Sequence, residues 1–517
     1  MIRVYNTLSK NKETFEPVTP GKVGIYLCGP TVYKPSHIGH MVGPTIFDAI
    51  KRYLVYSGYQ VTLVINITDV DDKLIVESNK RGIPMKAVAE EMTADYMRNL
   101  KAMGVDTIDQ FPKATDYIDA IIEFSEKLIG QGFAYASDGD VYFDVTKFAE
   151  YGKLSHRRAE EMQGEGGSTV DRKRNNGDFA LWKSAKPGEP SWNSPWGQGR
   201  PGWHIECSVM SSKLLGETFD IHGGGLDLVF PHHENEVAQS ECRHGKPPAK
   251  YWLHNGLMQA SSEVGKLGGR NTRESDAPLD GNQAAQEAGK MGKSKGASAF
   301  SELLKKFPGE TIRFFLLSTH YRRPIDFSEE RIDEVQIGLQ QFYRFFQRVE
   351  RVAGKNFYEL DYPRKRVDPP PATSELLKTC QERRAKFIEF MDDDFNTGGG
   401  VAELFEVLRT LNRFVDAEKL EDSAQRSPEK VETLVAGAKV LRELSATLGL
   451  FQAPVATAAP GGDDALVGKL MELVIDLRAE ARKTKNFATA DKIRNALTAA
   501  GIVLEDRADG TGWTVKK

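Results

Sequence analysis

Four side chains that commonly bind metal ions are spread over the first half of the sequence. They are Cys28, Cys207, His232 and Glu236. His232 and Glu236 are four residues apart at the start of an expected helix, so both side chains face the same way and can reach one ion. Two thiolates, an imidazole and a carboxylate form a ligand set that zinc accepts. These residues are therefore a candidate site for one zinc ion per chain.

The spacing of these residues leaves other interpretations open. His204 or His233 could replace His232 as the nitrogen ligand, and the four cysteines of the chain could simply be buried free thiols. A bound zinc ion could stabilise the fold as a structural site, or it could bind a soft group of a substrate. A thiol that binds zinc loses its proton, whereas a serine hydroxyl is a much poorer ligand. A site that depends on this bond could reject the hydroxyl analogue by roughly 10⁴ to 10⁵.

Two further segments have the chemistry of a nucleotide site. The first contains His37, Gly39 and His40 at the start of an expected helix, where free N–H groups and the helix dipole favour phosphate. Gly39 would let a nucleotide approach the backbone, and the imidazoles could donate hydrogen bonds to phosphate oxygens. The second segment contains Lys290 and Lys293 in a glycine-containing loop that could close over a triphosphate.

The elements that must position these residues form a strand, helix, strand pattern. Residues 23–28 and 61–67 are apolar and rich in β-branched side chains, and between them apolar residues recur at helical spacing. This pattern predicts a parallel sheet, and such sheets bind ligands at the carboxyl ends of their strands. We therefore expect an α/β fold with a Rossmann-like parallel sheet, in which Cys28 closes the first strand at the end where ligands bind.

Composition and periodicity divide the chain into a catalytic part and helical parts. We expect a catalytic domain over 1–310, with an inserted region at about 115–200 and a polar loop over 261–289. A helical bundle follows over 311–451, then a linker over 452–464 and a small domain over 465–517. The small domain has ten Lys and Arg against seven Asp and Glu, which fits either local RNA contact or a solvated helix face.

Charge and hydropathy exclude several classes of protein. The chain has 517 residues and a net charge of −4, which does not suit a strongly basic nucleic-acid coat protein. No apolar run approaches the roughly 18 residues that a membrane helix needs, and the first residues do not resemble a signal peptide. We therefore expect a cytoplasmic protein without membrane contact.

Two motifs in this order resemble those of class I aminoacyl-tRNA synthetases. His37-Ile38-Gly39-His40 resembles their HIGH motif, and residues 290–294 resemble a variant of their KMSKS loop. Longer stretches narrow the resemblance to the cysteinyl-tRNA synthetases, and they run nearly from end to end of the chain: residues 27–33, 66–73, 199–208, 220–236 and 252–256. The resemblance implies a catalytic domain, a helical bundle that contacts the tRNA stem at its start, and a small C-terminal anticodon-binding domain.

The resemblance also implies an activity and a set of site residues. The activity is ATP-dependent activation of L-cysteine and its transfer to tRNA-Cys by a cysteine–tRNA ligase, with Mg²⁺ accompanying ATP and a monomer as the expected state. Zinc that holds the substrate thiolate would be bound by Cys28, Cys207, His232 and Glu236. The cysteine pocket would be lined by Thr68, Trp203 and Asp227. ATP would be bound and its phosphates stabilised by His37, Gly39, His40, Lys290 and Lys293.

The sequence departs from the family pattern in the lysine loop, and two rival functions remain. Gly292 stands where the family usually has the middle serine, and the segment between Gly256 and Lys290 is longer than usual. One rival is the cysteine ligase of mycothiol synthesis, which shares the catalytic domain but lacks an anticodon domain. The other is a non-catalytic, zinc-stabilised RNA-binding protein.

Overall fold

The computed structural model describes residues 1–157, 172–260, 299–454, 464–507 and 510–515. The predicted ATP-binding lysines, Lys290 and Lys293, lie outside these residues, as do the loop expected over 261–289 and most of the expected linker. None of the helices in the described ranges is both long and apolar enough to cross a membrane.

A four-stranded parallel sheet forms the centre of the molecule and confirms the predicted fold class. Its strand order is β11 (Ala249–Asn255), β10 (Phe219–Gly225), β3 (Lys22–Leu27) and β4 (Gln60–Ile65). The helix α1 (Gly39–Tyr56) connects β3 to β4, and these two strands pair in parallel with Leu27 opposite Ile65. The strands are buried on both faces because helices cover them, which explains their continuous apolar sequences.

One helix lies before β10 in the sequence and another lies between β10 and β11. The helix α5 (Trp203–Leu215) precedes β10, and α6 (Glu234–His244) leads from β10 to β11. Between β10 and α6 the chain forms two short helical turns, η5 (Leu226–Leu228) and η6 (Val229–His233). Cys207 on α5, His232 on η6 and Glu236 on α6 are thereby brought to one end of the sheet.

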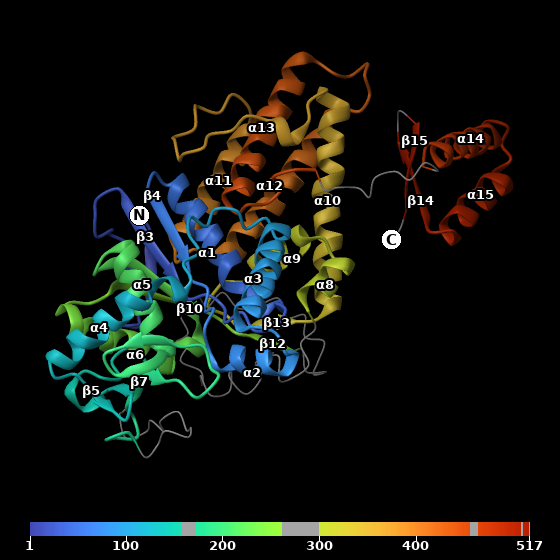
Figure 1. The fold of residues 1–517 in the computed structure, drawn as a ribbon. Helices are drawn as coiled ribbons and strands as arrows, with labels where there is room; N and C mark the ends of the chain where they lie inside the picture. Colours follow the sequence, from blue (N-terminus) through green and yellow to red (C-terminus); the bar gives the residue numbers. More distant parts are fainter. Residues whose placement is uncertain (158–171, 261–298, 455–463, 508–509, 516–517) are drawn as a thin grey trace.

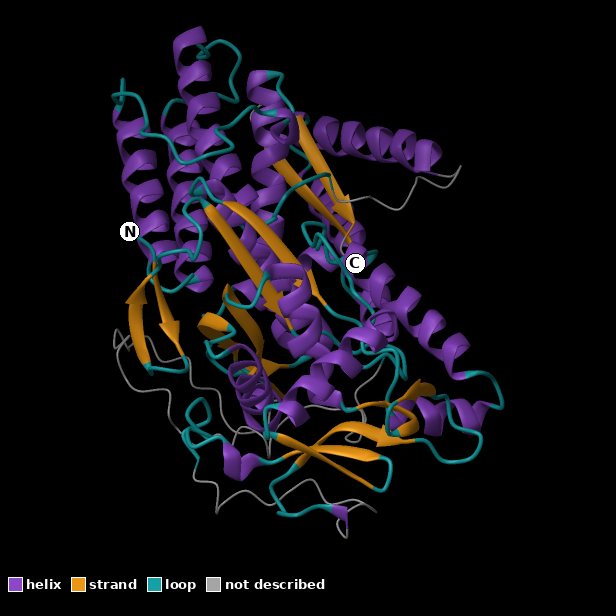
Figure 2. Ribbon diagram, turned by 60° about the vertical axis from the view of Figure 1, so that its left-hand side comes forward, coloured by secondary structure: helices purple, strands orange, loops and turns teal. Residues whose placement is uncertain are grey.

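The inserted region folds around a second hydrophobic core, at the opposite end of the molecule from the helical bundle (Figure 1, Figure 2). Helix α4 (Ile118–Gly130) packs there with a five-stranded antiparallel sheet of order β5-β6-β7-β9-β8. The strands are β5 (Ala134–Ser137), β6 (Asp140–Phe143), β7 (Phe179–Ser184), β8 (Trp192–Ser194) and β9 (Gly197–Pro201).

Shorter elements complete the catalytic part. The N-terminal hairpin is β1 (Arg3–Asn6) and β2 (Asn11–Thr14), and β12 (Met258–Ala260) pairs in parallel with β13 (Ile325–Phe327). The helices are α2 (Asp72–Arg81), α3 (Met85–Ala102), α8 (Phe300–Lys306) and α9 (Gly309–Leu317), with single turns η1 (Ala114–Tyr117) and η2 (Val145–Lys147).

The helical part consists of a bundle and a small C-terminal domain beside α10 (Figure 1). The bundle contains α10 (Glu329–Ala353), α11 (Glu375–Asp392), α12 (Thr397–Ala417) and α13 (Pro428–Thr447), and η8 (Phe357–Glu359) follows α10. The side chains of Ser328, Ser374, Asn396 and Ser427 accept hydrogen bonds from the first turns of these four helices. The small domain contains α14 (Asp464–Lys483), α15 (Phe487–Ala499), β14 (Ile502–Arg507) and β15 (Gly510–Val515).

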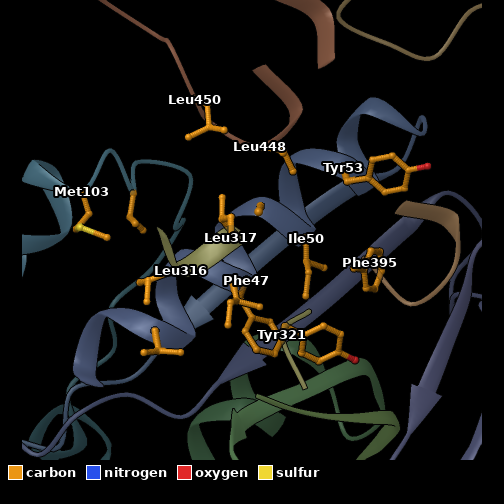
Figure 3. Packing of buried hydrophobic residues seen from close by; sticks show 14 of the residues in the cluster. Phe47, Ile50, Tyr53, Met103, Leu316, Leu317, Tyr321, Phe395, Leu448 and Leu450 are labelled. Atoms are coloured by element: carbon orange, nitrogen blue, oxygen red, sulfur yellow. The ribbon is translucent and has the colours of Figure 1, made fainter. Parts of the chain in front are cut away.

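A buried arginine joins the bundle to the helix that begins with the 37–40 motif. Arg313 on α9 pairs with Asp48 on α1, and both side chains are at most 1% exposed. Arg313 also donates to the carbonyl oxygens of Leu448, at the end of the bundle, and Gly104. Burial by itself would raise the pKa of Asp48, but Arg313 and Arg52 hold it below its ordinary value. Figure 3 shows that apolar side chains of α1, α9 and the end of the bundle also lie close together.

We expect Arg313→Met to lower the free energy of unfolding by about 2–3 kcal/mol, because it leaves the buried Asp48 carboxylate with Arg52 as its remaining arginine partner. Denaturant unfolding followed by circular dichroism measures this. The control is Arg331→Met, because Arg331 pairs with Asp326 at 2.7 Å while both side chains are about half exposed. The control should change the free energy by less than about 1 kcal/mol, and equal losses would contradict the prediction.

Candidate metal and nucleotide site

The four predicted zinc ligands meet at the carboxyl end of the parallel sheet. The Sγ atoms of Cys28 and Cys207 are 3.7 Å apart, and Cys28 Sγ lies 3.5 Å from Glu236 Oε1. His232 Nε2 lies 3.1 Å from the same Glu236 oxygen. One ligand atom from each of the four residues lies within 4.8 Å of the others. Four ligands at zinc bond lengths of about 2.0–2.3 Å in a tetrahedron are about 3.3–3.8 Å apart, so this donor set fits the ion.

Burial and mutual hydrogen bonding perturb the acidity of this cluster. Burial would raise the pKa of Glu236, but His222 and His232 lower it to about 2. Burial would lower the pKa of His232, but Glu236 and Cys207 raise it to about 10. Burial would likewise raise the pKa of Cys207, but hydrogen bonding from Cys28 and His232 lowers it to about 6. The protein thus favours the carboxylate and one thiolate, which are the forms that bind a metal ion.

The structure separates the three histidines that the sequence left as alternatives. His232 contacts Glu236 through Nε2, and its other ring nitrogen lies 3.0 Å from Nδ1 of His204. His204 therefore lies behind His232 and orients it. His233 approaches the cluster from another side, with Nε2 at 3.3 Å from Cys28 Sγ.

Two further histidines at the site were assigned no role from the sequence. His222 lies on β10 with Nε2 at 2.9 Å from Glu236 Oε2, and His254 lies on β11 with Nε2 at 2.8 Å from His233 Nδ1. Both rings are buried. The place of His254 at the end of β11 is a signal that could have identified it, since strand ends of a parallel sheet converge on the site, whereas His222 lies in the middle of β10 and gave no such signal.

The residues expected to line a cysteine pocket lie at or near the cluster. The Trp203 ring stacks on His232 with centroids 4.3 Å apart. Thr68 follows β4 and donates from Oγ1 to Glu206, the neighbour of Cys207, at 2.9 Å. Asp227 lies in η5, on the segment that connects β10 to His232. The structure therefore places all three on the same end of the sheet as the predicted zinc ligands.

The 37–40 motif forms the start of α1 at the same edge of the sheet. The rings of His37 and His40 are stacked with centroids 3.9 Å apart, and the Gly39 N–H donates to His37 Nδ1 at 3.1 Å. A Cβ atom on Gly39 would lie only 2.9 Å from the His37 ring, so a side chain there would force that ring to move. Imidazoles beside a helix N-terminus can bind phosphate groups.

The chain that follows the lysine loop is attached directly beside this motif. The N–H of Phe300, the first residue of α8, donates to the carbonyl oxygen of Ser36 at 2.7 Å. The N–H of Ser36 in turn donates to Asp95 Oδ2 on α3 at 2.9 Å. Asp95 therefore holds the residue before His37 in place, and that residue holds the start of α8.

The fold and the site define a class I aminoacyl-tRNA synthetase. Residues 14–267 and 282–337 match the family of class I (C) tRNA synthetase catalytic domains, and residues 386–452 match the DALR domain. In fold, the chain resembles a Mycobacterium tuberculosis methionyl-tRNA synthetase in complex with methionyl-adenylate, with a TM-score of 0.55 at 14% sequence identity. The likeness covers 83% of this chain and 89% of the other.

Full-length relatives identify the particular family. The chain is 43% identical to the cysteine–tRNA ligase of Geobacter sulfurreducens over 100% of both chains, and 44% identical to that of Heliobacterium modesticaldum over 99% of both. Residues 474–513 match the cysteinyl-tRNA ligase anticodon-binding domain. The chain belongs to the cysteine–tRNA ligase family and is an enzyme of that family. The predicted resemblance and enzyme class are thereby confirmed.

We expect Asp95→Ala to lower the kcat/KM of ATP–pyrophosphate exchange for ATP by about tenfold, since it removes a charged hydrogen bond of about 1.5 kcal/mol beside His37. The matched control on α3 is Glu90→Ala, whose side chain is 59% exposed and 4.0 Å from its partner Lys86. The control should exchange at the unmodified rate. Equal rates for both variants, or an equal loss of cysteine affinity, would contradict this role for Asp95.

Proposed function

We propose that this ligase activates L-cysteine with ATP, transfers it to tRNA-Cys, and selects the substrate thiol with one zinc ion held by Cys28, Cys207, His232 and Glu236. The observation that supports it best is the convergence of these four ligand atoms within 4.8 Å, directly beside Trp203. A bound zinc ion would accept the cysteine thiolate as a further ligand and would discriminate against the harder serine hydroxyl.

The protein's own side chains would bind and orient the rest of the amino acid. Trp203 and Thr68 would limit the pocket to a small side chain, because the indole ring and the buried threonine lie beside the metal ligands. The Asp227 carboxylate would attract the substrate ammonium group. Orientation of the bound carboxylate towards ATP then supplies much of the rate.

The nucleotide would bind at the start of α1. His37 and His40 would donate hydrogen bonds to the phosphates, and Gly39 would allow their close approach to the backbone. Lys290 and Lys293 would neutralise charge on the leaving pyrophosphate, and Mg²⁺ would arrive with ATP. A carboxylate oxygen of cysteine attacks the α-phosphorus as the bond to pyrophosphate breaks, and a terminal ribose hydroxyl of the tRNA then takes the cysteinyl group and releases AMP.

The other regions receive roles by the same family relation. The inserted region at about 115–200 would contact the acceptor end of tRNA. The start of the 311–451 bundle would contact the tRNA stem, and the 465–517 domain would bind the anticodon. The match of residues 474–513 to an anticodon-binding domain favours tRNA over the amino sugar used by the mycothiol ligase. A monomeric state and a cytoplasmic location remain predictions.

Charging of a tRNA-Cys transcript with labelled cysteine and ATP tests the proposal, with about tenfold excess of unlabelled serine as competitor. We expect strong charging that serine does not suppress, because the hydroxyl cannot replace the thiolate. Suppression by serine would contradict thiol selection by zinc. Absence of charging by folded, zinc-containing protein would favour one of the two rival functions.

We expect Cys28→Ala to abolish bound zinc and to raise the KM for cysteine, since it removes one of the thiolate ligands. Cys242→Ala is the control, because Cys242 is a free cysteine that is buried in the separate core of the inserted region. The control should keep its zinc. Zinc content by mass spectrometry checks this, and equal content in both variants would contradict the ligand assignment.

A further inference from the structure

The buried cluster contains a second complete set of metal ligands. Cys28 and Glu236 form a four-residue group with His222 and His233 as well as with Cys207 and His232. We propose that Cys28, His222, His233 and Glu236 form a second metal site, here called the inner site, which can hold the same ion. The set proposed above, with Cys207 and His232 in place of His222 and His233, is called the outer site. The inference rests on the zinc proposal, because both sites share two ligands.

The ligand atoms of the inner group lie within 4.8 Å of one another, close enough to reach one ion. His233 Nε2 lies 3.3 Å from Cys28 Sγ, and His222 Nε2 lies 2.9 Å from Glu236 Oε2. His233 Nε2 and Glu236 Oε1 are 4.0 Å apart. The distance between Cys28 and His233 matches the separation of about 3.3–3.8 Å expected between zinc ligands, whereas the two Glu236 distances involve different carboxylate oxygens and bracket it. A small rotation of the carboxylate would let one oxygen serve the ion. His222, His233 and Glu236 are each at most 1% exposed, so an ion there would be shielded from water.

Both inner imidazoles are held in place by further contacts. His222 is stacked on Trp252, with ring centroids 4.4 Å apart and planes inclined by 15°. His233 Nδ1 lies 2.8 Å from His254 Nε2, and His254 Nδ1 lies 2.8 Å from Thr7 Oγ1. A partner on the far ring nitrogen orients metal-binding histidines, as His254 does for His233, whereas His222 is oriented by its stack on Trp252. The inner ligands therefore need little rearrangement to bind an ion.

The two sites differ in chemistry and in access to the substrate. The outer set has two thiolates and adjoins Trp203, whereas the inner set has one thiolate and two imidazoles and adjoins Trp252. One sulfur and two nitrogens suit a borderline divalent ion such as zinc or cobalt. Because Cys28 and Glu236 belong to both sets, one ion occupies one set at a time. An ion in the inner set is retained by the protein but leaves Cys207 and His232 unbound.

Paired double variants of the full-length protein test the inner site. The outer-deficient variant is Cys207→Ser with His232→Gln, which leaves only two outer ligands but all four inner ones. The inner-deficient variant is His222→Gln with His233→Gln, which leaves the outer set complete. Zinc content and the zinc-edge X-ray absorption spectrum are measured for both and for the unmodified protein. A variant with all four substitutions is the metal-free control.

We expect the outer-deficient variant to keep about one zinc per chain, with one sulfur and two nitrogen neighbours instead of two sulfurs. The inner-deficient variant should keep zinc with two sulfur neighbours. A metal-free outer-deficient variant with an unchanged circular dichroism spectrum overturns the inner site.

If the outer-deficient variant does not fold, the single variant Cys207→Ala decides. A zinc-edge spectrum of this variant with one sulfur and two nitrogen neighbours supports the inner site. A spectrum with one sulfur and one nitrogen neighbour overturns it. Absence of zinc from the unmodified protein would instead overturn the zinc proposal itself.

Discussion

The parallel pairing of β3 with β10 and β4 is the constraint on which the site depends. This pairing places the carboxyl ends of the strands at one edge, so that Cys28 after β3 and Thr68 after β4 come together. The N–H of Cys28 donates to the carbonyl oxygen of Gly223 on β10 at 3.1 Å, which extends the pairing up to the metal ligand itself. A change of register here would move every ligand of the cluster relative to the others.

Helix α1 connects the chemistry at this edge to the segment that matches the DALR domain. Its N-terminus carries the stacked pair His37 and His40, and its middle carries Asp48, which pairs with Arg313 in the interior. Arg313 also binds the carbonyl oxygen of Leu448, where the DALR-matching segment ends. Displacement of the bundle would therefore strain a buried ion pair on the same rigid helix that is proposed to bind ATP.

The polar cluster at the sheet edge is a costly arrangement for a protein interior. Glu236 is buried among imidazoles, and burial lowers the pKa of both His233 and His204 well below the ordinary histidine value. The Glu236 carboxylate and the Cys207 thiolate are both favoured in their charged forms, whereas His232 is the one ring among these three histidines whose pKa is raised enough to hold a compensating proton. A divalent ion bound as proposed would supply further positive charge, which would help so many potential ligands to pack together away from water.

Much of the fold could be predicted from the sequence because its signals are local. The apolar runs of β3 and β4, the helical periodicity of α1 and the four bundle helices, and the motif blocks that contain Cys28, Cys207 and His232 are all read within short windows. Other features join distant segments: His222 with Glu236, His254 with His233, and Asp95 with Ser36. Periodicity could not show whether His232, His204 or His233 binds the metal. It predicts which face of a helix a side chain lies on, but not which residues of other elements that face contacts. The sequence alone thus determined the family, the parallel-sheet class and the residue types of the site, whereas only tertiary packing decided which ring nitrogen meets which ligand, since sheet register and helix contacts set those distances.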